Sequence, residues 1–569
     1  MRKSRFLVAL VICGVIGAAC ASSGDSGKET SAATTATTAT PVTSAEAITS
    51  AASTTLATDA VAITAVETTI PQQAVELSTT TTIEETPARD GSERMHFEVG
   101  PIDVQPGQNN IAYEGGIPQP EIDGWVTRMQ PDLRVGDGSV PPVDVIHLHH
   151  GVWLNTSKGD STAGVPERFL AAGEEKTINI FPAPYAYPYS TTDSWTLNYM
   201  LHNLTDELKQ VWITYDIDFI PGDSPAAVGI VGARPIWMDV QNGSVYPVFD
   251  VIKGTGGDGV YTYPTDADAP YGNGAAKNEW TVDRDGVLFA TAGHLHPGGL
   301  HTDLLATRDG ATAQLFRSEA QYFEPAGAVS WDVAMTATLP DWAVAVQAGD
   351  VLSTTATYDS ARASWYESMG IMVVWMADMP PVESGVVALD PFTNDVATPG
   401  MLTHGHLAEN DNHGGESAVG QYLDLTALPS EPVTGEIKIE DYGYEKGDMS
   451  FATAVPTVAP GGTIVYNNID APYLNGQWHT ITSCKAPCNQ TTGIAYPLAD
   501  GEIPFDSGEL GLGGPPTANR VTWNVPNDLP EGTYTYFCRI HPVMRGAFRV
   551  EDGQTTAAAG AADSTIAGG

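Results

Sequence analysis

Basic residues and cysteines are both scarce in this chain of 569 residues. Lys and Arg total 26 against 69 Asp and Glu, which gives a formal net charge of −43. Nucleic acids are bound by basic surfaces that neutralise phosphates, so this balance excludes a nucleic-acid partner. The chain also lacks a Gly-x-Ser-x-Gly elbow, a His-Glu-x-x-His motif and a glycine-rich phosphate loop. It therefore shows none of the usual signatures of serine hydrolases, zinc proteases or nucleotide-binding enzymes.

A sustained apolar run is present only near the N-terminus, from Phe6 to Ile16, after the basic residues Arg2, Lys3 and Arg5. The run is too short to span a membrane comfortably and predicts a signal peptide over residues 1–20. The sequence Gly-Ala-Ala-Cys ending at Cys20 resembles a bacterial lipobox, which predicts a lipidated Cys20 and membrane anchoring. The alternative is a secreted protein with an incidental leader cysteine. Either way, we expect a secreted or cell-surface protein of a bacterial envelope.

Low-complexity sequence follows the leader and also closes the chain. Residues 21–92 are mostly Thr, Ala and Ser with scattered Glu, and residues 553–569 are similar. Such segments cannot bury enough apolar surface to fold, so we predict a disordered stalk and a disordered tail.

Between these segments, apolar residues come in short alternating runs that are broken by Gly, Pro, Asn and Asp. Examples are 143–148, 211–217 and 371–375. This period of two, without a competing helical period, predicts an all-β protein. We expect two jelly-roll or β-sandwich domains (93–270 and 271–395), a His-rich connector (396–432) and a Greek-key β-sandwich (433–552).

The last of these domains contains the clearest motif, Cys538-x-x-His541-x-x-Met544, and His479 is the one His between residues 414 and 540. A Cys thiolate, two imidazoles and a weak Met ligand form a blue-copper electron-transfer site, also called a type 1 copper centre. This domain resembles the plastocyanin and amicyanin family of cupredoxins, and the spacing of its last three ligands is that of amicyanin. The resemblance implies a cupredoxin fold with these four residues as copper ligands.

The two other cysteines beyond the predicted leader, Cys484 and Cys488, lie four positions apart. In an oxidising compartment a local disulfide is the favoured interpretation, and a metal-binding pair is the alternative. Cys538 then stays unpaired, as a copper thiolate must.

Histidines are clustered in the first two predicted β domains. His294-Leu295-His296 places two imidazoles on one face of a strand, because side chains alternate along a strand. This pair could bind a metal ion as a bidentate ligand, although a lone His-x-His is weak evidence for a metal site. Further clusters are His147, His149 and His150, with His202 beyond them, and His404, His406 and His413 in the connector.

A longer pattern surrounds the His-x-His pair, namely the segments 293–297, 303–310, 321–323, 349–358 and 368–371. In order and spacing these segments resemble the C-terminal domain of the copper type II, ascorbate-dependent monooxygenases, which include dopamine β-monooxygenase and peptidylglycine α-hydroxylating monooxygenase. The resemblance implies that His294, His296 and Met369 hold the oxygen-activating copper and are catalytic. Met372 and Met376 are rival ligands, but they fall on the other face of the strand from Met369.

The N-terminal half resembles the same family more faintly. His149 and His150 resemble its adjacent pair of copper ligands, and His202 resembles the third ligand, which implies an electron-supplying second copper. Strand alternation alone would instead pair His147 with His149, whereas a strand end or bulge would turn both His149 and His150 inward. We predict the family pattern and keep His147 as a neighbouring or additional ligand.

Two features depart from the family. Residues 95–392 contain no cysteine, whereas the animal enzymes are rich in disulfides, and Ala292 stands where peptidylglycine enzymes carry the Arg that holds the substrate carboxylate. A peptidylglycine substrate is therefore not expected. The connector histidines His404, His406 and His413 match neither family and form either an extra metal site or a solvated turn.

Together these patterns predict an extracytoplasmic copper oxidoreductase with one type 1 and two type 2 copper centres. It would use O2 to hydroxylate a small-molecule or peptide substrate and take electrons from an external donor through the blue-copper domain. The main alternative is a non-enzymatic copper protein for electron transfer or copper storage. A β-sandwich for adhesion or substrate binding, with unused histidines, is a third possibility.

Overall fold

A computed structural model provides the structure, which describes residues 82, 86–105, 108–143, 145–203, 207–244, 247–323, 332–361, 364–379, 384–405, 422–471, 477–488, 504–512, 520–539, 541 and 544–552. The chain divides into the units Met1–Leu77 and Ser78–Gly569. The predicted signal peptide, Cys20, nearly all of the stalk and the tail lie outside the described residues. In the part of the chain that is described, no helix is long and apolar enough to cross a membrane.

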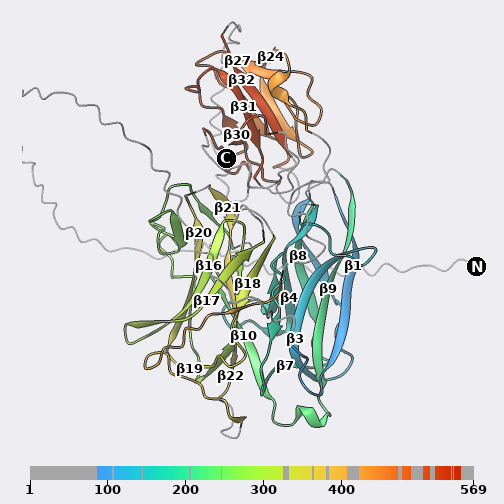
Figure 1. The fold of residues 1–569 in the computed structure, drawn as a ribbon, viewed down its shortest axis with the longest axis vertical. Helices are drawn as coiled ribbons and strands as arrows, with labels where there is room; N and C mark the ends of the chain where they lie inside the picture. Colours follow the sequence, from blue (N-terminus) through green and yellow to red (C-terminus); the bar gives the residue numbers. More distant parts are fainter. Residues whose placement is uncertain are drawn as a thin grey trace, which may run out of the picture. The chain divides into compact units, whose positions relative to one another are not determined.

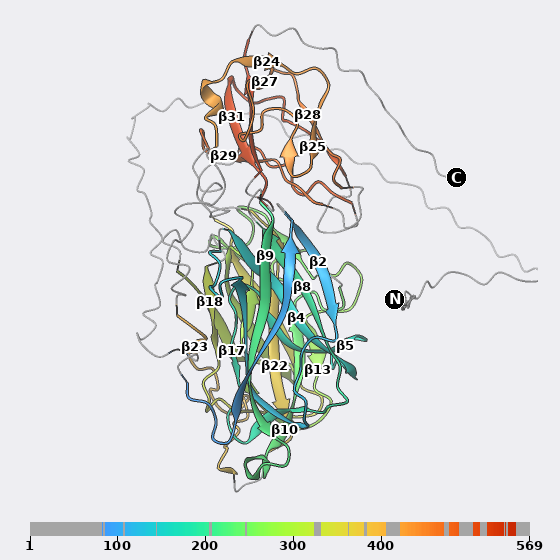
Figure 2. The same ribbon diagram turned by 90° about the vertical axis from the view of Figure 1, so that its right-hand side faces the viewer.

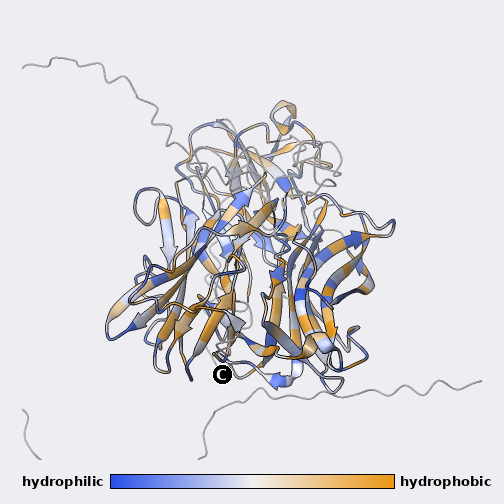
Figure 3. Cartoon of the chain, turned by 60° about the horizontal axis from the view of Figure 1, so that its bottom comes forward, coloured by the Kyte–Doolittle hydropathy of each residue, from blue (hydrophilic) through white to orange (hydrophobic). Residues whose placement is uncertain are grey.

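The all-β prediction is confirmed, since the described elements are strands apart from short 3-10 helices such as η2 (Pro225–Ala227) and η5 (Leu425–Ala427). Hydrophobic and hydrophilic bands alternate along many of the strands, as Figure 3 shows. Strands with this alternation pack one face on a core while the other meets solvent.

The largest sheet has ten strands and contains members from both predicted monooxygenase-like domains. Eight strands follow one another across it, with β6 and β15 attached to β3 and β22. In sheet order these are β1 (Glu93–Val104), β9 (Lys209–Pro221), β3 (Gly124–Val135), β7 (Tyr185–Tyr189), β10 (Val231–Asp239), β22 (Gly370–Ala377), β14 (Gly286–Ala290) and β19 (Val344–Val346), with β6 (Asn179–Ile180) and β15 (Gly293–Leu295) at the side (Figure 1).

A four-stranded sheet carries most of the N-terminal histidines. Its order is β2 (Asn109–Gly115), β8 (Trp195–Asn203), β4 (Ile146–Gly159) and β5 (Pro166–Ala172). Its apolar side chains, including Trp153 and Leu201, share one buried cluster with those of the ten-stranded sheet, including Ile213 and Trp375. The two sheets therefore enclose a common core.

The C-terminal half of this region adds a seven-stranded sheet and a two-stranded one. The larger contains β12 (Val260–Tyr263), β20 (Val351–Asp359), β16 (Gly299–Arg308), β17 (Ala311–Tyr322), β18 (Val333–Ala337) and β23 (Met401–Leu402), with β13 (Glu279–Thr281) paired to β20. The smaller pairs β11 (Phe249–Val251) with β21 (Trp365–Ser368). Figure 1 shows β16, β17, β18 and β20 running side by side. A second core cluster packs the seven-stranded sheet on the strands β10, β14 and β22.

The pairing of β10 with β22 crosses the boundary expected at residue 270. Seven consecutive residues of β10, from Ala233 to Asp239, pair antiparallel with Ala377 to Ile371. β11 and β12 likewise pair with β21 and β20. Residues 231–263 thus belong by hydrogen bonding with strands of the second predicted domain, and the two halves share one backbone network.

The C-terminal region forms two sheets around a core of its own. One has the order β24 (Ser430–Pro432), β27 (Val455–Val458), β32 (Arg545–Val550), β31 (Gly532–Phe537) and β29 (Thr482–Cys484). The other has the order β26 (Gly443–Tyr444), β25 (Glu436–Glu440), β28 (Val465–Asn468) and β30 (Thr522–Asn524). Figure 2 shows β25 and β28 beside each other and β31 in the other layer. Cys538 and Met544 belong to the buried cluster between these sheets.

Candidate metal centres

The predicted type 1 ligands converge at one end of the C-terminal β-sandwich. Cys538 follows directly after β31, and its Sγ lies 3.9 Å from His479 Nδ1 and 3.8 Å from His541 Nδ1. The two Nδ1 atoms are 3.1 Å apart. Among the described residues, this trio is the one group of His, Cys, Asp and Glu whose ligand atoms all lie within 4.8 Å of one another. The triangle has the size and the soft donor set of a copper site.

Hydrogen bonds fix each member of this trio. The backbone N–H groups of Thr480 and His541 both donate to Cys538 Sγ at 3.3 Å, which stabilises a thiolate. The Nε2 of His479 lies 3.0 Å from Asp470 Oδ2, so the ring can donate there and keep its Nδ1 lone pair for a metal. Met544 is buried, and its backbone N–H donates to the carbonyl of His541.

His541 is also the ligand nearest to the N-terminal histidines. It is only 1% exposed, and its ring centroid lies 5.7 Å from that of His202 and 4.9 Å from that of Tyr442. Its neighbour in sequence, Arg539, donates a hydrogen bond to the carbonyl of Ser364, just before β21. The copper end of the C-terminal sandwich is thus covered by residues of the preceding region.

The His-x-His pair is buried, and both rings are oriented by oxygen acceptors. His294 Nδ1 lies 2.9 Å from Glu175 Oε1, and His296 Nδ1 is hydrogen-bonded to the backbone carbonyl of Glu367. When each Nδ1 carries the proton for these acceptors, the lone pair of each neutral ring is on Nε2. The two ring centroids are 5.2 Å apart. Fixing the tautomer in this way is typical of metal-binding histidines.

Met369 lies between β21 and β22 and is tied to the same structure. The Tyr358 hydroxyl donates to the carbonyl of Met369 at 2.6 Å and accepts from the backbone N–H groups of Met369 and His296. Met369 lines the same cavity as His294. Met372 and Met376 instead pack in the second core cluster, as expected from strand alternation. His294 and Met369 thus offer an imidazole and a thioether to one cavity, and with the imidazole of His296 this donor set suits Cu(I).

The N-terminal histidines lie close together in the structure. The ring centroid of His147 lies 5.0 Å from that of His202 and 6.4 Å from that of His149. His149 is the extra residue where the pairing of β4 with β8 shifts between Leu148 and His150. The ring centroid of His150 lies 5.8 Å from that of His149, and His150 lines the cavity of His294. The expected bulge is present, and the rings of His147 and His149 both lie near that of His202, with centroids 5.0 and 6.1 Å away.

The two histidine groups touch each other. The ring centroids of His149 and His296 are only 4.5 Å apart. Burial lowers the pKa of His147 and of His150 to about 3, and it lowers the pKa of His149 and His296 well below the ordinary value of 6.5. These rings are therefore neutral at physiological pH, and protons do not compete with a metal for their lone pairs.

A buried charged segment, Gly173-Glu174-Glu175-Lys176, supports this region and was missed by sequence reasoning. Glu175 is 1% exposed and accepts from the Gly173 N–H as well as facing His294. Lys176 Nζ forms ion pairs with Asp132 at 3.0 Å and with Glu174 at 3.2 Å. In the sequence, two adjacent Glu and a Lys indicate a solvated loop. The role of Glu175 follows only from the residues that surround it in the folded chain.

The connector histidines and the cysteines are the remaining predicted residues. Both ring nitrogens of His404 lie 2.6 Å from backbone carbonyl oxygens, those of Gly405 and Glu175, so its lone pairs are not presented to a metal. His406 and His413 lie outside the described residues. Cys484 and Cys488 form a disulfide, and Cys538 is free and buried.

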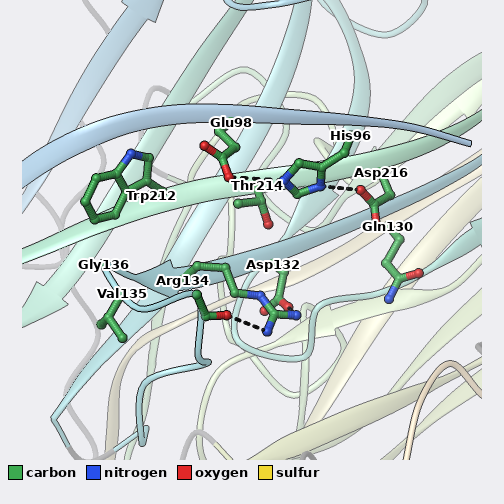
Figure 4. Close-up of a pocket in the computed structure, with 11 residues that line it drawn as sticks. His96, Glu98, Gln130, Asp132, Arg134, Val135, Gly136, Trp212, Thr214 and Asp216 are labelled. Atoms are coloured by element: carbon green, nitrogen blue, oxygen red, sulfur yellow. Dashed lines mark hydrogen bonds and ion pairs between the residues drawn. The ribbon is translucent and has the colours of Figure 1, made fainter.

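A separate surface pocket surrounds His96 (Figure 4). The side chain of His96 is 54% exposed and contacts Asp216 at 2.6 Å and Glu98 at 3.2 Å. Arg134 and Asp132 form an ion pair on β3, which lies in the same sheet two strands away from His96. The single His and its exposure agree with a surface residue rather than a ligand.

Comparisons with known proteins assign no family to the chain. No family model matches the sequence. No curated protein matches it either. Among solved structures, the Cu(I) form of an amicyanin mutant is 19% identical, and the match covers 21% of this chain and 85% of that chain with a TM-score of 0.13.

Two further structures match longer stretches. A Cu-containing nitrite reductase from Thermus scotoductus is 13% identical, covering 47% of this chain and 55% of that chain with a TM-score of 0.15. PNGF-II is 10% identical, covering 51% and 66% with a TM-score of 0.26. These scores are far below those of chains that share a whole fold, so the assignment rests on the ligand geometry. By that geometry, the C-terminal β-sandwich carries a Cys and two His in an arrangement that suits copper.

Proposed function

We propose that this protein is an extracytoplasmic, copper-dependent monooxygenase that hydroxylates a C–H bond and receives electrons through its cupredoxin-like domain. One observation carries the proposal. The Nδ1 atoms of His294 and His296 are both engaged by buried oxygen acceptors, which directs the Nε2 lone pairs to a metal, and Met369 lines the same cavity as His294. This donor set fits copper.

The first metal would be held by His294, His296 and Met369, and a second by His149 and His202 together with His147 or His150. Copper supplies O2 activation in this chemistry, in which one oxygen atom enters the C–H bond, the other leaves as water, and two electrons and two protons are consumed. The residues of the chain orient the ligands, exclude water by burial and keep the rings neutral.

A short route for electrons supports the role of the type 1 site. The ring of His541 packs edge-on against that of His202 at 5.7 Å, and His149 packs against His296 at 4.5 Å. Together with the contact between His202 and His149, whose ring centroids are 6.1 Å apart, these contacts link the type 1 ligands to the proposed catalytic ligands through histidines alone. An external donor would reduce the type 1 copper.

Lipidation at Cys20 would keep the protein at the membrane. Labelling with a fatty acid, lost in Cys20→Ser, tests the anchor.

One observation favours the alternative, a non-enzymatic copper protein for electron transfer or copper storage. In the described part of the chain, only the type 1 trio already has all its ligand atoms within 4.8 Å of one another. The histidine group around His149 and His296 would then bind copper in closed sites, or not at all.

O2 uptake by the reduced, copper-loaded protein separates these functions. Met369→Ala should abolish substrate-dependent O2 uptake and hydroxylated product, whereas Met379→Ala, at a methionine that is 55% exposed, should change neither. Copper analysis with EPR should give one type 1 and two type 2 centres in the wild type. Equal O2 uptake by the wild type and Met369→Ala, or type 1 copper alone, would contradict the monooxygenase and support the electron carrier.

A further inference from the structure

A cavity of about 420 Å³ lies beside the proposed catalytic ligands. It is formed by residues of β4, β5, β8, β10 and β22, and His150, His294 and Met369 belong to its wall. Its volume is within the range of small-molecule sites in proteins. A molecule in it would lie directly against two of the residues proposed to hold the first metal.

Most of the remaining wall is apolar. Val152 and Leu154 come from β4, Ala171 and Ala172 from β5, and Ile371 from β22. The hydrogen-bonding groups on the wall include the uncharged side chains of Asn198, Thr196 and Ser244. Such a lining binds ligands by removing apolar surface from water and orients them with a few polar contacts.

The two charged residues on the wall, Arg168 and Asp239, are already engaged by other groups of the protein. Arg168 forms two hydrogen bonds of 2.9 Å to Asp160 and stacks on the ring of Trp237 at 4.4 Å. Asp239 accepts from Trp237 Nε1 at 3.2 Å and from the Gln241 N–H at 2.8 Å. A charged ligand would lose its hydration here, and the side chains of the wall offer it only an Arg168 that is paired with Asp160 and an Asp239 that is already hydrogen-bonded, so that loss is costly.

We propose that this cavity is the substrate site and that it takes an uncharged, largely apolar small molecule rather than a charged amine, a carboxylate or a peptide terminus. The hydroxylation of that molecule rests on the proposed function, but its binding does not. Ala292 agrees with this selectivity, because the His-x-His strand offers no cation for a carboxylate.

Two fluorescent probes with one skeleton test the selectivity. N-phenyl-1-naphthylamine is uncharged, and 1-anilinonaphthalene-8-sulfonate adds a negative charge. Titrated into the oxidised, copper-loaded full chain without reductant, the uncharged probe should bind at one site per chain and at least about tenfold more tightly than the sulfonate. Phenethylammonium should not displace the bound probe, whereas naphthalene should.

Ala171→Trp fills the cavity and should weaken binding of the uncharged probe by about tenfold or more. Val228→Trp, at a side chain that is 86% exposed and not on the cavity wall, is the matched control and should leave binding unchanged. Unchanged blue absorption and copper content in both variants show that the fold is kept. Equal affinity for the two probes, or no effect of Ala171→Trp, overturns the proposal.

This result is distinguishable from a failure of the proposed function. If the uncharged probe binds as described but no apolar compound is hydroxylated, the monooxygenase fails and the apolar site stands. If hydroxylation occurs only with charged substrates, the monooxygenase stands and the proposed selectivity fails.

Discussion

Replacing Glu175 tests whether a buried carboxylate positions the proposed catalytic ligand His294. Glu175 Oε1 lies 2.9 Å from His294 Nδ1, and both side chains are nearly inaccessible to solvent. Losing such a partner of a metal-binding histidine typically costs about 10- to 100-fold in metal affinity. This corresponds to about 1.4–2.7 kcal/mol, which is the size expected for a hydrogen bond to a charged group.

The assay is competition for Cu(I) with a chromogenic chelator, in a Cys538→Ser background that removes the type 1 site. Glu175→Ala should lose about 10- to 100-fold in Cu(I) affinity. Glu175→Gln should lose less, because its amide oxygen still accepts the Nδ1 proton. Glu207→Gln, at a side chain that is 71% exposed, is the control and should behave as the parent.

The reasoning is refuted if Glu175→Ala unfolds at the same temperature as the parent and binds Cu(I) within about threefold of it. In that case the contact between Glu175 and His294 would be a packing feature without influence on the metal.

Three further predictions concern single side chains. Gly173→Ala should weaken Cu(I) binding to a similar extent, because an added Cβ would lie 2.6 Å from Glu175 Oε2 and 2.7 Å from His294 Cε1; the same competition assay measures it. Cys538→Ser should abolish the intense blue or green colour of the Cu(II) protein, and a colourless copper-loaded wild type would contradict the type 1 assignment. Burial raises the pKa of Asp239 to about 6 from the ordinary 3.8, so between these pH values the folded state binds more protons than the unfolded chain. Stability should thus fall by about 3 kcal/mol as the pH rises through this window, and urea unfolding of Asp239→Asn should lack that contribution.

The sequence was sufficient for features that depend on local spacing. Alternating apolar residues predict strands wherever one face is buried, so the all-β class follows from the pattern alone. Cys538, His541 and Met544 are close in sequence, and a tight loop after β31 brings the first two together with little help from the rest of the chain. Met369 and Met372 lie on opposite faces, which also follows from the alternation of side chains along a strand.

Features that depend on the pairing of distant strands were not accessible in this way. His147 lies directly opposite His202 in the pairing of β4 with β8, and the register shifts just beyond it, between Leu148 and His150; no local signal gives such a register. Glu175 is 119 residues away from His294, and its neighbours Glu174 and Lys176 suggest a solvated loop. Their burial depends on ion pairs, such as that from Lys176 to Asp132, that only the folded chain forms.

The antiparallel pairing of β10 with β22 limits how this protein can be dissected. A fragment ending at residue 270, the predicted boundary, would carry β10 without the strand that satisfies the backbone groups of Ala233 to Asp239. An exposed edge of that length invites self-association. The complementary fragment would lack β10, the strand that pairs with β22. Because β22 begins directly after Met369, this loss would affect the proposed metal site. Expression of either half alone is therefore a poor way to isolate one metal centre, and single-site variants of the intact chain are the sounder choice.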